Sequence, residues 1–469
     1  MTSDFTRSAR AYRLASYYLG KLRTVDEAMR RGQVHISYGK TVFDQEWEQI
    51  RHWQQWTTQR EPDDQERARL CRDFALTGLE VLANRVNRTE HSAWLRAALE
   101  AAKQLDDRGA ERILCYELMM MNYRSGSLDM GKQLADRLLQ LGEAANDILC
   151  TERAYFGLAV YCEERGMYAE AEQNYQRALR LSNQLGLAIE AGRALNALGG
   201  VAQYVGEFDK SYQYCAQYLE LMETRGEKTR VCHALLSVGE SLISLKAFSD
   251  AERHLQRAVR MCRALGLHRL LGVGLLTLGV LRIEEGKLEA AQVYLEEGLL
   301  EVRAVGVQRQ IMYGLTRLGY IAARSGDYTA ALGHLHEALA MSRAVGNPRY
   351  IGDVQLQLAY AYLALDDEST ARVALYESLR LALALGSRSQ KVRNLSGAIA
   401  HAEKLGQHER AALWTGTIMG ESVIDLPVFA PICARLEAAL GHDGYQAALE
   451  KGRLRSLDDV VNEAMTYLA

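Results

Sequence analysis

Residues 306–346 read GVQRQIMYGLTRLGYIAARSGDYTAALGHLHEALAMSRAVG, and Gly306, Gly326 and Gly346 are spaced twenty residues apart. Glycine adopts at no steric cost the left-handed backbone conformation that commonly ends an α-helix. Each interval therefore predicts one helix of about 16 residues followed by a turn. Two such helices, with their turns, form a repeat of 40 residues.

The same spacing extends over most of the chain. One glycine series comprises Gly126, Gly166, Gly206, Gly286, Gly326 and Gly406, and the other comprises Gly186, Gly226, Gly266, Gly306, Gly346 and Gly386. Lys246 and Asp366 occupy the two missing places of the first series. Glu368 replaces the aromatic residue of other copies, so the turn at Asp366 has the weaker sequence support.

The segments between the turns have the pattern of packed helices. Apolar residues recur at helical spacing, as in Leu195, Leu198 and Ala202, which predicts amphipathic helices. Small residues recur once per repeat, as Gly199, Gly239, Gly279 and Gly319 in the first helix and as Ala171, Ala251, Ala291, Ala331, Ala371 and Ala411 in the second. We expect the two helices of each repeat to approach closely at these positions.

The best copy of the repeat contains Leu315, Leu318, Gly319, Gly326, Tyr328, Ala331, Leu335 and Ala338. This pattern resembles the tetratricopeptide repeat (TPR). The resemblance covers about residues 110–415 and implies an all-α fold, a right-handed TPR superhelix (α-solenoid) of antiparallel helix pairs. The 40-residue form is similar to the TPR arrays of spindle-orientation adaptors, of bacterial Rap-type regulators, and of the sensor arms of multidomain signalling NTPases and maltose-activator-like regulators.

Four segments are predicted. Residues 1–60 form an N-terminal helical segment, 61–110 a degenerate first repeat or cap, 111–415 the TPR array, and 416–469 a C-terminal helical cap. Both ends resemble segments that flank such arrays in bacterial regulators. No nucleotide-binding domain precedes the array and no DNA-binding helix-turn-helix follows it, so we expect a sensor module encoded alone.

Composition narrows the classes of partner. The chain of 469 residues has 56 Lys and Arg against 59 Asp and Glu, which provides no overall attraction to nucleic acid. The eight cysteines never form a CxxC motif and lie mostly on apolar helix stripes, which is typical of reduced core thiols. No leader-like or membrane-spanning apolar stretch occurs, so no membrane contact and a cytoplasmic location are expected.

Motifs that carry chemistry are incomplete. Gly126, Gly131 and Lys132 have the spacing of a phosphate-binding loop, but Gln133 stands where a magnesium-binding Ser or Thr is needed. The sequence HLHE, which begins at His334, lacks the spacing of a zinc motif. We therefore expect no enzyme activity, no cofactor and no metal.

The resemblance implies that the first helix of each repeat lines a concave groove. The groove residues that it implies are Arg193, Asn196, Tyr204, His233, Leu236, Glu240, Ile243, Leu276, Val280, Ile283, Tyr313, Arg317, Tyr320, Arg324, Gln357 and Tyr360. Ordinary packing between repeats is the alternative for each of them.

Two features of this set suggest an occupant. The five apolar members of the set should not be needed for pairing the helices, so we expect a partner segment or the chain's own C-terminal tail to cover them. Tyr313, Arg317, Tyr320 and Arg324 form one helical stripe that would favour an acidic element. The acidic residues Glu163, Glu164, Glu240 and Glu284 would favour a basic one.

Two functions remain open at this stage. The first is a non-catalytic scaffold or regulatory adaptor that binds a protein or peptide partner in the groove. The partner could be a signalling NTPase or an effector, or, through self-association, a second copy of the chain. The second is a sensor of a small effector such as an oligosaccharide, which tyrosines on a concave wall could stack against.

Overall fold

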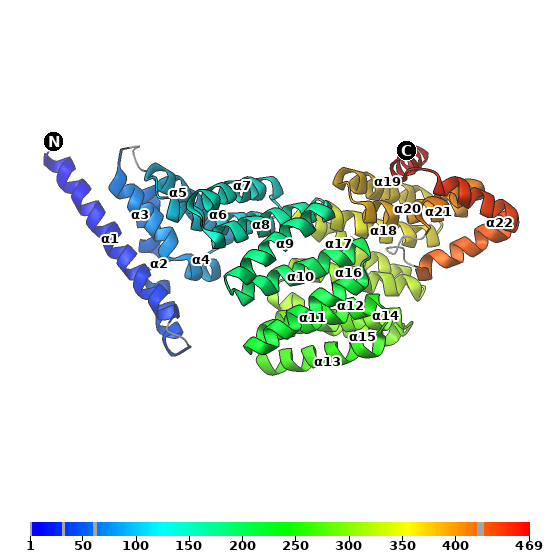
Figure 1. Ribbon diagram of the computed structural model, residues 1–469, viewed down its shortest axis with the longest axis horizontal. Coiled ribbons are helices and arrows are strands. Elements are labelled where there is room, and N and C mark those ends of the chain that lie inside the picture. The colour runs from blue at the N-terminus through cyan, green and yellow to red at the C-terminus, as the bar shows by residue number, and fades with distance from the viewer. Residues whose placement is uncertain (1, 31–32, 60–62, 420–425) are drawn as a thin grey trace. The chain divides into compact units, whose positions relative to one another are not determined.

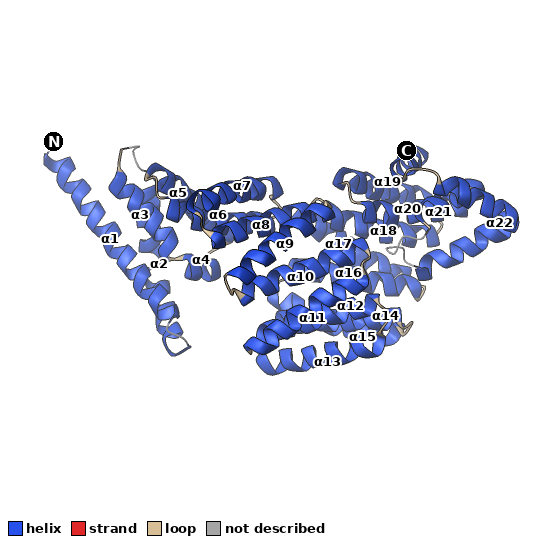
Figure 2. Cartoon of the chain, viewed as in Figure 1, coloured by secondary structure: helices blue, strands red, loops and turns tan. Residues whose placement is uncertain are grey.

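The structure is a computed structural model that describes residues 2–30, 33–59, 63–419 and 426–469. Within these ranges it contains 23 helices and no strand (Figure 2). The all-α repeat fold expected from the sequence is therefore confirmed. A bilayer-spanning helix needs about 20 consecutive apolar residues, and none of the helices in the described part of the chain provides such a segment.

The chain divides into two compact units, Met1–Tyr161 and Cys162–Ala469. The helices of the first unit are α1 (Thr2–Arg30), α2 (Gln33–Thr58), α3 (Gln65–Thr77), α4 (Leu79–Arg85), α5 (Arg88–Gln104), α6 (Arg108–Arg124) and α7 (Leu128–Ala145). The boundary between the units falls in α8 (Ile148–Glu164). In the first unit α1 and α2 form a hairpin against α3, and Trp47 stacks on Trp94 beside the buried Phe74.

The second unit contains the regular helix pairs (Figure 1). Its helices are α9 (Tyr168–Gln184), α10 (Ala188–Val205), α11 (Phe208–Arg225), α12 (Lys228–Ser244), α13 (Phe248–Leu265), α14 (His268–Glu284), α15 (Leu288–Val305), α16 (Gln308–Arg324), α17 (Tyr328–Val345), α18 (Pro348–Ala364), α19 (Glu368–Leu385), α20 (Arg388–Lys404), α21 (His408–Ile418), α22 (Leu426–Arg453) and α23 (Leu457–Leu468). We call α10, α12, α14, α16, α18 and α20 the first helices of their repeats, and the odd-numbered helices that follow them the second helices.

A left-handed residue ends a helix at sixteen positions spaced twenty residues apart, from 106 to 406. Lys246 (φ 60°) and Asp366 (φ 59°) are among them, so both turns expected without glycine are present. At Gly326 the amide N–H of Asp327 donates to the carbonyl of Ala322 (2.9 Å), a bond that satisfies a carbonyl left free at the helix end. Equivalent hydrogen bonds, such as that from Glu207 to Ala202, recur at most of the turns, so the same backbone geometry ends one helix after another.

The paired helices approach each other closely because glycine residues of the first helix leave room for side chains of the second. A Cβ atom placed on Gly279 would lie 2.6 Å from Cγ of Leu295, and one on Gly319 would lie 2.6 Å from Cγ of Leu335. A leucine of the second helix therefore fills the space above a glycine of the first. The eight cysteines are free thiols, and seven of them are buried in this kind of packing.

The C-terminal helices close one end of the second unit. Helix α22 packs on α21 and is kinked at Gly441, and α23 packs on α19 and α20. Trp414 is fully buried there, and its indole N–H donates to Glu463 (3.2 Å). His401 and Tyr467 share a hydrogen bond of 2.8 Å in the same core. The described part of the tail thus covers the end of the helix array.

Candidate binding surface on the first helices

The first helices of the second unit face one another across an inner surface. The guanidinium carbon of Arg349, at the start of α18, lies 4.1 Å from the ring centre of Tyr204, at the end of α10. A Cβ atom on Gly166 would lie 3.1 Å from Cβ of Ser387, so two turns far apart in the sequence also meet. Residues 162–469 therefore curve until first helices from distant repeats come into contact.

Aromatic and cationic side chains gather where α10 and α18 meet. The rings of Tyr168 and Tyr204 stack with centres 5.6 Å apart and planes at 22°. Arg349 lies over Tyr204, and the guanidinium carbon of Arg309 lies 5.7 Å from the ring centre of Tyr350. Burial raises the pKa of Tyr350 to about 12, so its hydroxyl stays protonated at neutral pH. We call these five residues the tyrosine–arginine cluster.

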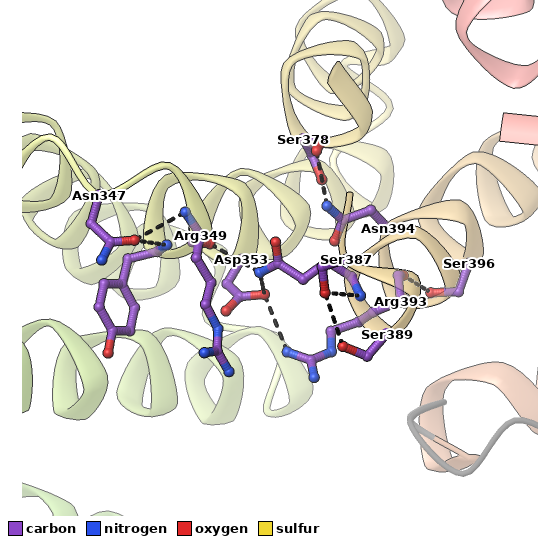
Figure 3. Close-up of polar contacts among 11 residues, drawn as sticks. Asn347, Arg349, Asp353, Ser378, Ser387, Ser389, Arg393, Asn394 and Ser396 are labelled. Atoms are coloured by element: carbon purple, nitrogen blue, oxygen red, sulfur yellow. Dashed lines mark hydrogen bonds and ion pairs between the residues drawn. The ribbon is translucent and has the colours of Figure 1, made fainter. Parts of the chain in front are cut away.

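The start of α18 is held in place by polar contacts (Figure 3). The Asn347 side chain accepts hydrogen bonds from the backbone N–H groups of Arg349 (3.0 Å) and Tyr350 (3.4 Å), which caps the helix. Asp353 accepts a charged hydrogen bond from Arg393 of α20 (3.2 Å). In Figure 3 the guanidinium groups of Arg349 and Arg393 extend to the same side of the helices as Asp353. The cap therefore fixes the backbone from which Arg349 extends, and the ion pair connects α18 to α20.

Carboxylates share this inner surface. Burial raises the pKa of Glu163, which accepts a hydrogen bond from the Tyr175 hydroxyl (2.7 Å), and Arg309 and Arg349 act in the opposite direction. Burial also raises the pKa of Glu240, although its side chain is in contact with solvent. A charged group that contacts solvent but is largely surrounded by protein is typical of a recess in the surface, because such a group loses only part of its hydration.

Glu163→Gln is expected to stabilise the protein at about pH 8 and to have no stabilising effect at about pH 4. The pKa of Glu163 is higher in the folded than in the unfolded chain, so ionisation above the folded pKa costs folding free energy, and the cost vanishes below the unfolded value of about 4.3. Glutamine keeps an acceptor for Tyr175. Melting temperatures of Glu163→Gln and of the exposed control Glu220→Gln across this pH range measure the effect; a difference that does not change with pH contradicts it.

The structure places most of the expected groove residues on accessible parts of the first helices. Those that are exposed or half-buried are Arg193, Asn196, Tyr204, His233, Glu240, Val280, Ile283, Tyr313, Arg317, Arg324, Gln357 and Tyr360. Asn196 accepts a hydrogen bond from Ser237 (2.6 Å), and the guanidinium carbon of Arg317 lies 5.0 Å from the ring centre of Tyr313. Their role in binding stays a prediction.

His233 lies within electrostatic reach of two arginines. Burial, together with the nearby charges of Arg269 and Arg230, lowers its pKa to about 4. Its ring is therefore neutral at physiological pH. Its Nδ1 atom is buried and has no hydrogen-bond partner among the residues that the structure describes.

The expectation of an exposed apolar strip is wrong for three residues. Three residues of the strip belong to the hydrophobic core. Their solvent-exposed fractions are 3% for Leu236, 6% for Ile243 and 1% for Leu276. Successive first helices also contact one another, so α14 packs against α12 and α16 as well as against second helices. A helix with neighbours on all sides needs apolar residues around its whole circumference. These leucine and isoleucine side chains require no lid.

Tyr320 is a further correction to the expected stripe. Its side chain is buried, with an exposed fraction of 8%, and its hydroxyl accepts a hydrogen bond from Arg324 (3.2 Å). Within the stripe, Tyr313 and Arg324 are therefore exposed and Arg317 is half-buried.

Tyr360 lies at a separate place. Its hydroxyl is 2.9 Å from that of Ser396, and its ring lines an open pocket of about 610 Å³. Helices α18, α20, α21 and α22 contribute to this pocket, and Arg435 of α22 forms an ion pair with Glu403 at its edge (2.7 Å). Tyr360 thus lies beside the C-terminal cap, three helical turns along α18 from Arg349.

Sequence reasoning missed four members of the cluster: Tyr168, Arg309, Arg349 and Tyr350. Arg309 lies one helical turn before Tyr313 and on the same face. Extending the groove stripe toward the helix start, by one turn from Tyr313 and by two turns from Gln357, would have found both arginines. Among the described residues, His, Cys, Asp and Glu side chains form no group suited to holding a metal ion.

Comparisons with known proteins add evidence on the fold. No family model matches the chain, and no curated protein is similar to it in sequence. A crystal structure described as a Rap protein complexed with competence and sporulation factor has a TM-score of 0.54 at 15% identity, covering 85% of this chain and 99% of that one. The Rap conjugation gene regulator of plasmid pLS20, in complex with the Phr* peptide, has a TM-score of 0.49 at 14% identity, covering 81% and 97%. The chain has a TPR-type helical-repeat fold.

Proposed function

We propose that the inner surface of residues 162–469 binds a segment of a protein or peptide partner and that the chain acts as a non-catalytic scaffold or regulatory adaptor. One observation carries the proposal: Arg349 of α18 lies against Tyr204 of α10, so that side chains from distant repeats form one surface. Groups from several first helices can then contact a single extended ligand along its length.

The composition of this surface supports a polypeptide ligand. Tyrosine and arginine are the residue types most enriched where proteins bind one another, because they combine a large apolar area with polar ends. Here they stand beside the carboxylates of Glu163 and Glu240, which offer acceptors for backbone and side-chain donors of a ligand. The Rap structure of similar fold is described as a complex with a factor, which supports a ligand-binding use of such an array.

We further propose that the module acts separately from the enzyme or effector that it regulates. A signalling NTPase is one candidate partner, by the resemblance of the sequence to the sensor arms of such proteins. Self-association through the array is another candidate arrangement. Binding experiments at varied protein concentration distinguish it from binding of a different partner.

A small effector such as an oligosaccharide is the second candidate, and the stacked pair Tyr168 and Tyr204 favours it. Aromatic faces bind sugar rings through their apolar sides. A ligand that binds only the folded chain raises its melting temperature in a saturable way. Such a rise with oligosaccharides, and none with peptides, would select this second function.

Tyr204→Ala is expected to weaken peptide binding about 30-fold, the effect typical of losing a central aromatic contact. The measurement is the affinity of the full chain for peptides selected from a random-sequence display library. Tyr212→Ala is the matched control, because Tyr212 is an exposed tyrosine on the second helix α11. A library that yields no binder, or binders that both variants affect equally, would refute the proposed surface.

A further inference from the structure

Two columns of arginine follow the 40-residue period in the second unit. Arg263, Arg303 and Arg343 stand near the ends of the second helices α13, α15 and α17. Arg269, Arg309 and Arg349 are each the second residue of the first helices α14, α16 and α18. We call these the outer and the inner arginine column.

The outer column is neutralised by a matching column of glutamates. Arg303 pairs with Glu337 (2.6 Å) and Arg343 pairs with Glu377 (2.9 Å), each on the next second helix. Arg263 pairs with Glu297 in the same way. Three ion pairs of one kind thus connect successive repeats on this side of the array.

In the described part of the chain, the inner column is not paired with glutamates in this way. Among the residues that the structure describes, no carboxylate lies within ion-pair distance of Arg269, Arg309 or Arg349. Arg309 and Arg349 contact tyrosine rings instead, and Arg269 and Arg309 are exposed. The column therefore presents positive charge that no direct ion pair within the described residues neutralises, while Glu164 acts on Arg309 and Asp353 acts on Arg349 from a longer distance.

Helix stability does not account for the inner column. The first turn of a helix carries a partial positive charge, so a cation there is unfavourable and an anion is preferred. The same unfavourable placement recurs in three successive repeats. The electrostatic influence of the column is directed inward: Arg269 lowers the pKa of His233, and Arg309 opposes the rise in the pKa of Glu240.

We infer that the inner arginine column binds the carboxylates of an extended acidic polypeptide segment. This inference rests on the proposed function and names the chemistry of the partner. Neighbouring first helices pack against each other, which places their axes about 10 Å apart. An extended chain advances about 3.3 Å per residue. A ligand with an acidic residue at every third position therefore matches the spacing of the column.

A nucleic acid fits this surface less well. The chain has a formal net charge of -3, and Glu163, Glu164 and Glu240 lie within electrostatic reach of Arg309 or Arg349. A continuous phosphate backbone would be repelled by these carboxylates. A peptide can place its acidic side chains at the arginines and its neutral or basic groups at the glutamates.

Fluorescence anisotropy on the full chain tests the inference with four labelled probes. The first is a peptide of about twelve residues with glutamate at every third position. The second has the same composition with its glutamates adjacent, the third has lysine in place of glutamate, and the fourth is a single-stranded oligonucleotide of similar length. The first probe is expected to bind most tightly and to lose affinity as NaCl is raised, because salt screens exposed charges.

Arg309→Gln and Arg349→Gln are each expected to weaken the first probe about tenfold, as loss of one charge-assisted contact does. The matched control is Arg303→Gln in the outer column, which should bind the probe like the unmodified chain. Unchanged melting temperatures show that a variant is folded.

Three outcomes overturn the inference: equal affinity of Arg309→Gln and the unmodified chain, tighter binding of the lysine probe, or tighter binding of the oligonucleotide. If library-selected peptides bind through Tyr204 but the glutamate probe does not bind, only the acidic chemistry is refuted. If neither kind of peptide binds, the proposed function fails with it.

Discussion

Gly452→Val is expected to detach the C-terminal helices from the rest of the array and to lower the free energy of unfolding by about 3 kcal/mol or more. A Cβ atom on Gly452 would lie 1.9 Å from the carbonyl oxygen of Leu413, and one on Gly416 would lie 2.2 Å from that of Leu449. Helices α21 and α22 therefore cross with their main chains in contact. Backbone atoms cannot turn aside as a flexible side chain can, so the helices must separate.

The consequence reaches the core that these helices share. Trp414 and Val460 are fully buried in it, and they lose their neighbours when α22 moves. Circular dichroism melting and limited proteolysis of the C-terminal region measure the effect. Gly444→Ala is the control on the same helix, because among the described residues a Cβ atom there comes within 4 Å of Leu440 alone, at an ordinary contact distance of 3.6 Å. A Gly452→Val protein as stable and as protease-resistant as the control would show that the crossing is looser than described.

Leu276→Ala is expected to lower the free energy of unfolding by about 2 to 5 kcal/mol. Leu276 is fully enclosed by α14, α15 and α16, where it packs in one core with Leu299 and Leu315. Removing its branched end leaves a cavity, and the lining atoms lose contacts that the surrounding helices cannot restore.

Urea unfolding of Leu276→Ala gives this free energy directly. Leu300→Ala is the matched control, since Leu300 on α15 is 70% exposed and its truncation should change stability by less than about 0.5 kcal/mol. Stability equal to that of the control, together with weaker peptide binding, would restore Leu276 to the ligand-binding surface.

Local backbone chemistry explains how far the turns could be predicted. Wherever glycine marks the period, the turn expected from the sequence is present, and Lys246 and Asp366 adopt the same left-handed conformation without glycine. Asp106 and Asn146 extend the period toward the N-terminus, and they were missed because neither is a glycine. Asparagine and aspartate tolerate this conformation better than other side chains, so a search that admitted them would have found both.

The candidate site was harder to predict. Leu276 and Tyr313 both occupy first-helix positions expected to face the groove, yet the first is buried and the second is exposed. Which of them meets solvent depends on how closely neighbouring first helices pack, and the apolar pattern of one helix does not contain that information. The pairing of Arg349 with Tyr204 depends on the accumulated curvature of all the repeats between them.

The helix pairs, their period and the close contact of their small residues were determined by the sequence alone, because each depends on residues near one another in the chain and on the backbone geometry of one turn. The tertiary structure alone decided which side chains the inner surface presents and which residues meet across it. Small rotations between repeats add up over the array, and their sum, which no local pattern encodes, brings α10 and α18 together.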